Sequence, residues 1–219
     1  MMHNNKIYKA EDNSNNSMLP GDPSGSPDES LIFIDDGFRS KLSKHFGNGM
    51  YIKFDKILFA YNLSKKENLQ CKQIFYYTAP PFQSRIPTKE EELRKEGHDR
   101  FIKKLREKGA MVREGRCQRL KINNLFLYKQ KAVDSLAIID LMSIPIKYPN
   151  VKKIIIISSD SDFVPAIQSL RELGIKTILY TYYERRRDTN FSRNNELIKS
   201  VHKYVLLNKE DLNNTLLKK

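Results

Sequence analysis

A run of four isoleucines, from Ile154 to Ile157, is followed three and five residues later by two carboxylates, Asp160 and Asp162. A β-branched run that is apolar on both faces favours a central strand of a parallel sheet with helices on either side. In such sheets, ligands bind outside the carboxyl ends of the strands, where these two aspartates are expected. Neighbouring carboxylates repel each other, and a hard divalent cation that prefers oxygen ligands is the usual reason to place them together. The segment therefore predicts a metal site at the edge of a buried sheet.

The rest of the chain alternates apolar strand patterns with amphipathic helix patterns. Strands are expected at 31–35, 73–78, 153–158, 176–180 and 204–206, with weaker candidates at 111–114 and 119–127. Helices are expected at 40–46, 55–61, 89–108, 132–147, 163–173 and 194–202. This alternation predicts a doubly wound α/β fold with a mainly parallel central sheet.

One domain accounts for most of the 219 residues, a length that suits a single α/β core. Residues 1–30 are rich in Asn, Ser, Asp, Pro and Gly and are expected to form a disordered N-terminal tail. The folded domain is predicted at 31–207, and 208–219 is expected to be a C-terminal tail.

The charge of the chain points to a polyanionic partner. The formal net charge is +13, and residues 1–30 hold two lysines against five acidic residues, so the remainder carries about +16. A surplus of this size favours nucleic acid before membrane, since binding releases counterions condensed on the phosphates. A generally lysine-rich proteome is the alternative explanation.

Several classes of protein are disfavoured by what the sequence lacks. Two cysteines are too few for a disulfide framework or a zinc ligand set. The start of the chain carries no basic and apolar leader, and no run of 18 apolar residues occurs, so a soluble cytoplasmic protein is expected. No glycine-rich dinucleotide fingerprint follows the first strand, and no phosphate-binding loop of the Walker type is present.

Two further aspartates are candidates for the same site. Asp35 ends the first predicted strand, so it should emerge at the same sheet edge as Asp160 if the two strands are parallel neighbours. Asp134 lies in the first turn of an apolar helix, where it could supply a third ligand, whereas Asp140 lies six positions later and points elsewhere. Each acid also has a local explanation: Asp162 could cap a helix, Asp134 could favour its helix dipole, and Asp35 could open a turn.

Three segments of the chain, in this order, resemble the NYN domain family, whose members are relatives of PIN-domain nucleases. They are Phe-Ile-Asp-Asp-Gly-Phe at 33–38, Lys-Ala-Val-Asp at 131–134 and Ser-Ser-Asp-Ser-Asp-Phe at 158–163, the last followed by Pro165 and Leu173-Gly174. The likeness extends over roughly 31–207. It implies a PIN-like three-layer α/β/α sandwich and metal-dependent ribonuclease activity with acids at Asp35, Asp134, Asp160 and Asp162. Many members carry Asn three positions after the first Asp, where this chain has Phe38.

The leading hypothesis is hydrolysis of RNA assisted by one or two Mg²⁺ or Mn²⁺ ions that the four aspartates hold. The RNA is expected to be single-stranded or to contain unpaired regions, because an arginine-rich and aromatic loop follows a core strand. Candidate RNA contacts are Lys131, Ser159, Ser161, Arg185, Arg186, Arg187 and Arg193.

Several alternatives to this hypothesis stay open at the level of sequence. The arginine-rich loop could be an ordinary solvated surface, and both serines could act as helix caps. The whole domain could be a non-catalytic RNA-binding module of an RNA-processing assembly. A phosphatase of the haloacid dehalogenase type ranks lowest, because Asp35-Asp36-Gly37 lacks the required Asp-x-Asp spacing. The sequence leaves a homo-oligomer possible.

Overall fold

A mixed sheet forms the centre of the molecule. The computed structural model describes residues 7–9, 27–123, 125–185, 189 and 191–217. Within these residues, six parallel strands lie in the order β4-β3-β2-β7-β8-β9, and β1 pairs antiparallel with β9. The strands are β1 Ile7–Lys9, β2 Asp28–Asp35, β3 Leu69–Thr78, β4 Met111–Glu114, β7 Lys153–Ile157, β8 Lys176–Thr181 and β9 Lys203–Leu206.

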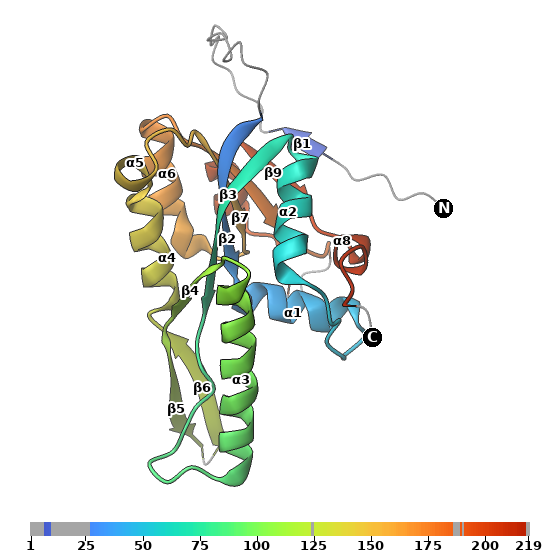
Figure 1. Cartoon of the computed structure of the whole chain (residues 1–219), viewed down its shortest axis with the longest axis vertical. Helices are drawn as coiled ribbons and strands as arrows, with labels where there is room; N and C mark the ends of the chain where they lie inside the picture. Colours follow the sequence, from blue (N-terminus) through green and yellow to red (C-terminus); the bar gives the residue numbers. More distant parts are fainter. Residues whose placement is uncertain (1–6, 10–26, 124, 186–188, 190, 218–219) are drawn as a thin grey trace, which may run out of the picture.

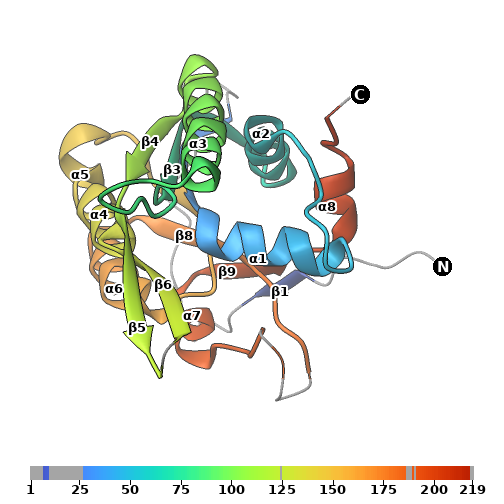
Figure 2. The same ribbon diagram turned by 90° about the horizontal axis from the view of Figure 1, so that it is seen from below.

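Helices cover both faces of this sheet (Figures 1 and 2). On one face lie α4 Val133–Met142, α5 Ile144–Lys147, α6 Val164–Glu172 and α7 Asn195–Ser200. On the other lie α1 Asp36–Phe46, α2 Lys56–Lys66, α3 Lys89–Glu107 and α8 Lys209–Asn213. Among the described helices, none combines the length and the apolar character that a bilayer crossing requires.

The isoleucine run supplies both hydrophobic cores. Ile154 and Ile156 pack toward α4 and α6, whereas Ile155 and Ile157 pack toward α1 and α2, and all four are buried. Successive side chains of a strand point to opposite faces, so a strand covered on both sides must be apolar throughout. The predicted doubly wound, three-layer α/β/α architecture is confirmed.

The two central strands, β2 and β7, mark the point where the winding of the sheet reverses. From β2 the chain continues to β3 and β4 on one side, and from β7 it continues to β8 and β9 on the other. Ile34 pairs with Ile157, so the carboxyl ends of β2 and β7 lie side by side. A crevice between diverging loops forms at such a position, and it is where open α/β sheets bind ligands.

Two predicted elements differ from the structure. The weak strand expected at 119–127 is instead part of a separate antiparallel hairpin, made of β5 Arg116–Ile122 and β6 Leu125–Lys131. The helix expected at 132–147 is interrupted at Ser143, because Pro145 has no amide hydrogen to continue the helical ladder, and α5 starts there with proline in its first turn.

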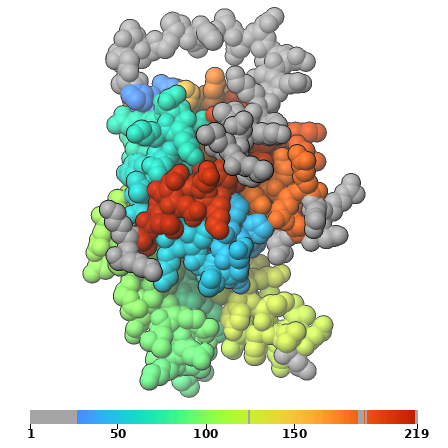
Figure 3. Space-filling view, turned by 90° about the vertical axis from the view of Figure 1, so that its right-hand side faces the viewer, coloured from blue at the N-terminus to red at the C-terminus, as the bar shows by residue number. Residues whose placement is uncertain are grey.

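Both predicted tails contain residues that belong to the packed structure. At the N-terminus, β1 pairs with β9, and β2 begins at Asp28 rather than at residue 31; residues 1–6 and 10–26 lie outside the described part. At the C-terminus, α8 lies against α1 and α2 (Figure 3). Leu212 is 1% exposed, and the amide of Asp55 donates to the Thr215 carbonyl at 2.8 Å. Residues 208–217 therefore belong to the packed structure, and the expectation of a C-terminal tail is wrong for them.

We predict that Leu212→Ala lowers the free energy of unfolding by about 2 to 5 kcal/mol, because it removes a fully buried side chain and leaves a cavity. Leu217→Ala is the matched control, since Leu217 is 53% exposed, and it should change stability by about 0.5 kcal/mol or less. Urea denaturation of both variants measures the difference. Equal, small effects would show that α8 does not contribute to the core.

Candidate metal centre

A buried serine joins the ends of the two central strands. Ser158 follows β7 and donates its hydroxyl to Oδ2 of Asp35 at 2.8 Å. The amide of Asp160 in turn donates to Ser158 Oγ at 3.2 Å. The end of β2 and the loop after β7 are thus connected through one hydroxyl, which fixes Asp35 relative to Asp160.

Asp35 and Asp160 also cap helices. Asp35 Oδ1 accepts the amide of Phe38 at 3.2 Å at the start of α1. Asp160 Oδ1 accepts the amide of Asp162 at 2.9 Å and begins the 3₁₀ helix η1 Ser161–Phe163. The cap of this turn is therefore Asp160 and not Asp162. Capping by Asp160 uses one carboxylate oxygen and leaves the other available for a ligand.

Asp134 is placed by an unusual backbone path. Ala132 adopts φ of +65°, a left-handed conformation that costs a non-glycine residue about 1 to 2 kcal/mol, and α4 begins directly after it. The chain passes close to Gly115 here: a Cβ on Gly115 would lie 2.4 Å from the Lys131 carbonyl oxygen and 2.7 Å from Val133 Cγ2. Strain of this kind concentrates at functional sites, and here it directs Asp134 toward η1.

Three aspartates meet at the switch point. Asp134, Asp160 and Asp162 each offer a carboxylate oxygen, and these oxygens lie within 4.8 Å of one another. Asp35 is not a member of this group, although it lines a pocket together with Asp134 and Asp160. This acidic pocket has a volume of about 320 Å³ and is lined by Asp35, Gly37, Phe38, Lys41, Gln130, Asp134, Ser159, Asp160 and Ser161.

The electrostatics of the acids fit a divalent cation. Partial burial raises the pKa of Asp134, and the charges of Asp160 and Asp162 raise it further. Burial raises the pKa of Asp35 as well, with Asp134 and Asp36 adding to the effect against the hydrogen bonds from Ser158 and Phe38. A hard divalent cation with oxygen ligands would relieve this repulsion, so the donor set suits such an ion.

A second buried carboxylate next to Asp35 behaves differently. Although burial opposes its charge, the pKa of Asp36 is lowered, because Arg39 pairs with it and the hydroxyls of Tyr76 and Thr78 donate to it. Asp36 therefore holds α1 against β3 as an ionised group. Sequence alone does not distinguish the pKa values of the two adjacent aspartates. Their opposite shifts depend on partners from α1, β3 and the loop after β7.

Asp140 lies apart from the acidic pocket, as its helical position predicted. Both of its oxygens accept from Arg113, at 2.6 and 2.8 Å, and the hydroxyl of Tyr77 donates to Oδ2 at 3.1 Å. These contacts tie α4 to β3 and β4.

Phe38, which stands where many family members carry Asn, is 4% exposed and packs in the core beneath α1. Its ring therefore makes no polar contact at the site.

The predicted RNA contacts lie in different parts of the structure. Ser159 and Ser161 line the acidic pocket, whereas Gln130 lines it in place of Lys131, which is exposed at the end of β6. Arg185 and Arg193 are exposed and line a separate pocket of about 450 Å³. Arg186 and Arg187 lie outside the described residues.

Two contacts near the site were missed at the level of sequence. Lys41 lines the acidic pocket from α1 and takes part in no ion pair among the described residues. Asn194, the cap of α7, donates to the Ser159 carbonyl at 3.4 Å and so connects the loop that carries Arg193 to the acids. Neither has a sequence signal beyond an ordinary helix pattern.

A parallel three-layer sandwich with clustered aspartates at its switch point is the architecture of the PIN-like class of proteins. The family model of the NYN domain matches residues 47–208, which is more than half of the chain, and the chain belongs to this family. NYN domains are a ribonuclease-type hydrolase family of the PIN-like superfamily, as the predicted resemblance implied. The match includes Asp134, Asp160 and Asp162 but begins after Asp35.

A solved structure shares the fold. The crystal structure of a protein of unknown function from Vibrio parahaemolyticus superposes with a TM-score of 0.57 at 15% sequence identity, and the alignment covers 89% of this chain and 99% of that one. At this identity the likeness supports the fold alone. No curated protein sequence matches the chain.

We predict that Mn²⁺ or Mg²⁺ stabilises the protein, by about 2.7 kcal/mol at a free concentration 100 times the dissociation constant. Asp134→Asn should abolish this gain and, without added metal, should be at least as stable as the parent, because it removes a repelling charge. Thermal unfolding with and without metal measures both effects. Asp99→Asn on the exposed surface of α3 is the matched control and should keep the gain. Loss of stability in metal-free Asp134→Asn would indicate a purely structural role.

The stabilisation should also depend on pH. Protons compete with the cation for Asp134 and Asp35, whose pKa values are raised, so affinity is full at about pH 7 and falls as the pH is lowered through these values. The competition should begin above the ordinary aspartate value of 3.8. Metal titrations followed by calorimetry at several pH values measure it. An affinity that does not change between about pH 7 and about pH 4 would contradict carboxylate ligation.

We further predict that Gly115→Ala weakens metal binding and lowers the free energy of unfolding by about 1 to 3 kcal/mol, because the added methyl group forces the backbone before Asp134 to move. Gly97→Ala is the control. Its Cβ would meet only Arg100, at 4.0 Å, and it lies within α3, where alanine stabilises a helix by up to about 1 kcal/mol. The two substitutions should therefore shift the melting temperature in opposite directions.

Proposed function

We propose that the protein is a metal-dependent ribonuclease that hydrolyses RNA phosphodiester bonds at the acidic pocket. The single observation that carries this proposal is the group of three carboxylate oxygens within 4.8 Å, at the switch point of an NYN domain. In a protein of net charge +13, three acids in one place favour a specific ligand over chance.

Asp134, Asp160 and Asp162 would hold one or two Mg²⁺ or Mn²⁺ ions, with Asp35 as the fourth acid of the site from the end of β2. A bound divalent cation supplies Lewis acidity, which makes water more acidic and stabilises negative charge on a phosphate. Ser158 holds Asp35 in position through its 2.8 Å hydrogen bond, so the carboxylate is oriented before substrate arrives.

Other side chains of the pocket suit a phosphate group. Lys41 brings a cation to its rim, and Ser159 and Ser161 bring hydroxyl donors to the same wall. No histidine lines the acidic pocket within the described residues, so proton transfer would rely on carboxylates and water. A bound metal ion and the cation of Lys41 would together attract a negatively charged phosphate.

The neighbouring basic loop supports RNA as the substrate. Arg193 lies over the ring of Tyr183, at 5.4 Å from its centroid, and Arg185 lines the same pocket. An aromatic ring beside guanidinium groups can hold an unpaired base and its phosphate together. We propose that this loop, including Arg186 and Arg187, and Lys131 at the end of β6 contact the RNA around the cleavage site.

We predict that Asp160→Asn reduces RNA cleavage at least about 100-fold, since changes outside the ligand shell of a metal already cost 10- to 100-fold. Asparagine retains an oxygen that can accept the Asp162 amide, so the cap of η1 and the fold should persist. Cleavage of single-stranded and structured RNA, with Mn²⁺, Mg²⁺ or EDTA, measures the effect.

Asp99→Asn serves again as the control, because it makes the same chemical change on the surface of α3. It should cleave like the parent. Unchanged cleavage by Asp160→Asn would refute the assignment of the site. Tight RNA binding by the parent without any cleavage in Mn²⁺ or Mg²⁺ would instead identify a non-catalytic RNA-binding module.

A further inference from the structure

The β5–β6 hairpin projects beyond the central sheet alongside α3 (Figure 1). Every described residue of β6 is exposed, and none of the residues of β5 is fully buried. Both ends of the hairpin lead to the acidic pocket: β5 starts after Gly115, and β6 ends at Lys131, three residues before Asp134. A two-stranded arm of this kind buries little surface of its own, so its side chains are available for a ligand.

The register of the hairpin separates two faces of different chemistry. Residues directly opposite each other in an antiparallel pair share a face. The first face, termed the aromatic face, consists of Cys117, Arg119, Lys121, Phe126, Tyr128 and Gln130. The second, termed the aliphatic face, consists of Arg116, Gln118, Leu120, Ile122, Leu125, Leu127, Lys129 and Lys131.

The aromatic face runs directly into the acidic pocket. Gln130 lines that pocket, and Tyr128 and Phe126 follow along β6 at intervals of two residues. Two residues of an antiparallel strand span about 6.8 Å, which is within the reach of successive nucleotides of an extended single strand. Bases that contact Tyr128 and Phe126 would therefore belong to nucleotides adjoining the one at the acids.

On this face, the cations of β5 lie beside the aromatic rings of β6. The guanidinium of Arg119 lies between Phe82 and Phe126, with its central carbon 4.6 Å from each ring centroid. Phe82 also contacts Tyr128, at 5.6 Å between centroids. Phe126 and Tyr128 nevertheless remain 52% and 55% exposed, so each ring keeps a surface on which a base can stack.

A small pocket beside Tyr128 adds a place for a flat group. Its volume is about 220 Å³, and its lining is Pro81, Phe82, Arg94, Cys117 and Tyr128. Among the described residues, Arg94, Arg119 and Lys121 take part in no ion pair. Apolar rings beside these cations match the combined demands of a base and its phosphate.

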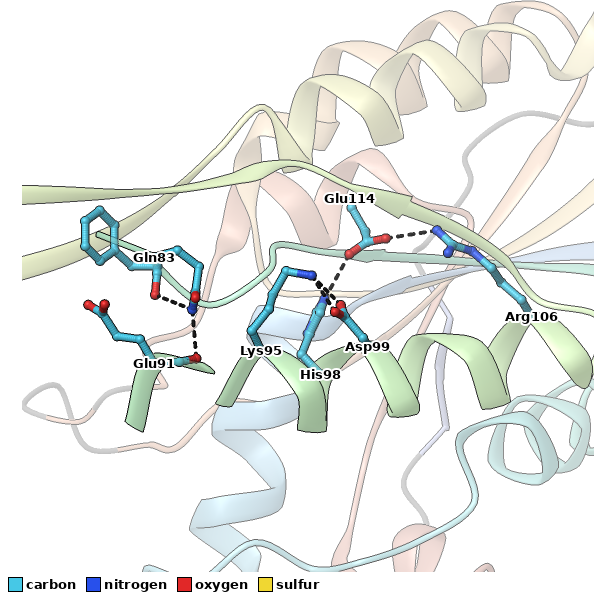
Figure 4. A network of polar contacts seen from close by, with 8 residues as sticks. Gln83, Glu91, Lys95, His98, Asp99, Arg106 and Glu114 are labelled. Carbon is cyan, nitrogen blue, oxygen red and sulfur yellow. Dashed lines mark hydrogen bonds and ion pairs between the residues drawn. The ribbon is translucent and has the colours of Figure 1, made fainter. Parts of the chain in front are cut away.

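The segment that carries Phe82, which contacts Tyr128 of the hairpin, is held in place by hydrogen bonds (Figure 4). Gln83 donates to the Glu91 carbonyl at 2.8 Å, and Glu91 accepts in turn from Ser84 and Thr88, which fixes the segment that carries Phe82 on the start of α3. Glu114, at the base of the hairpin, contacts both His98 and Arg106 of α3 at 2.9 Å. Phe82 and the base of the hairpin are thus ordered without a ligand.

We propose that the aromatic face of the hairpin binds single-stranded RNA and leads it into the acidic pocket at Gln130. The combination of half-exposed rings on β6 with neighbouring cations on β5 favours an unpaired nucleic acid, because a duplex hides the faces of its bases. This inference deepens the proposed function by assigning the path of its substrate, and it rests on that function for the direction of the path.

The test is a binding measurement that needs no catalysis. A fluorescein-labelled, unstructured oligouridine of about 12 nucleotides is titrated in EDTA, and its integrity is checked on a gel. Phe126→Ala and Tyr128→Ala should each weaken binding at least about 5-fold, the lower bound for losing one stacked base. Arg119→Ala should also reduce the slope of log K against log salt by about 0.7.

Two controls separate stacking from unfolding of the arm. Leu127→Ala removes a similarly exposed side chain from the aliphatic face of the same strand and should change affinity less than about 2-fold. Tyr128→Phe keeps the ring and should bind like the parent. Equal affinities for parent, Phe126→Ala and Tyr128→Ala overturn the proposal, and so does an equal loss in Leu127→Ala.

Two further outcomes bear on the occupant of the hairpin and on the proposed function. Light scattering that shows a dimer in the parent and a monomer in Tyr128→Ala would make a second copy of the chain the occupant and would overturn the RNA assignment. A parent that binds RNA but never cuts it refutes the ribonuclease proposal and leaves the hairpin result intact. A parent that cuts RNA while hairpin variants bind normally refutes only the hairpin.

Discussion

Mutual repulsion among carboxylates is the constraint around which this structure is arranged. Asp134, Asp160 and Asp162 approach within 4.8 Å of one another, and Asp35 lines the same pocket. The surrounding structure supplies what holds them there: a serine hydroxyl between two strands, a left-handed Ala132, and a glycine where no Cβ fits. The left-handed Ala132 costs backbone strain, and the close approach at Gly115 restricts that position to glycine, whereas the Ser158 hydroxyl stabilises the charge of Asp35.

The predictable part of the fold is the part whose local pattern has one structural solution. Four consecutive isoleucines suit only a strand covered on both faces, so the sheet and its acidic edge follow from the sequence. The hairpin was predicted as a single weak strand because the segment from Leu120 to Leu127 reads as one largely apolar run, and its turn lacks a glycine. The short helix α8 was missed because its role depends on contacts with distant α2.

The candidate site, like the fold, could be predicted from the sequence only in part. Asp160 and Asp162 could be placed by the strand that precedes them, and Asp134 by the start of its helix. The separation of Asp35 from the three grouped acids, and the opposite environments of Asp35 and Asp36, could not be placed, because Ser158, Arg39 and Tyr76 decide them. Identical side chains in adjacent positions acquire different protonation behaviour only through partners that tertiary structure provides.

The pairing of β2 with β7 has a consequence for a chain that is still being made. Asp35 ends β2 and Asp160 follows the adjacent strand β7, but they are separated by more than half of the sequence, so they meet only after the intervening residues have been synthesised and wound into the sheet. Until then, Asp35 is not joined to the group formed by Asp134, Asp160 and Asp162. The proposed site is therefore complete only after most of the chain has been made.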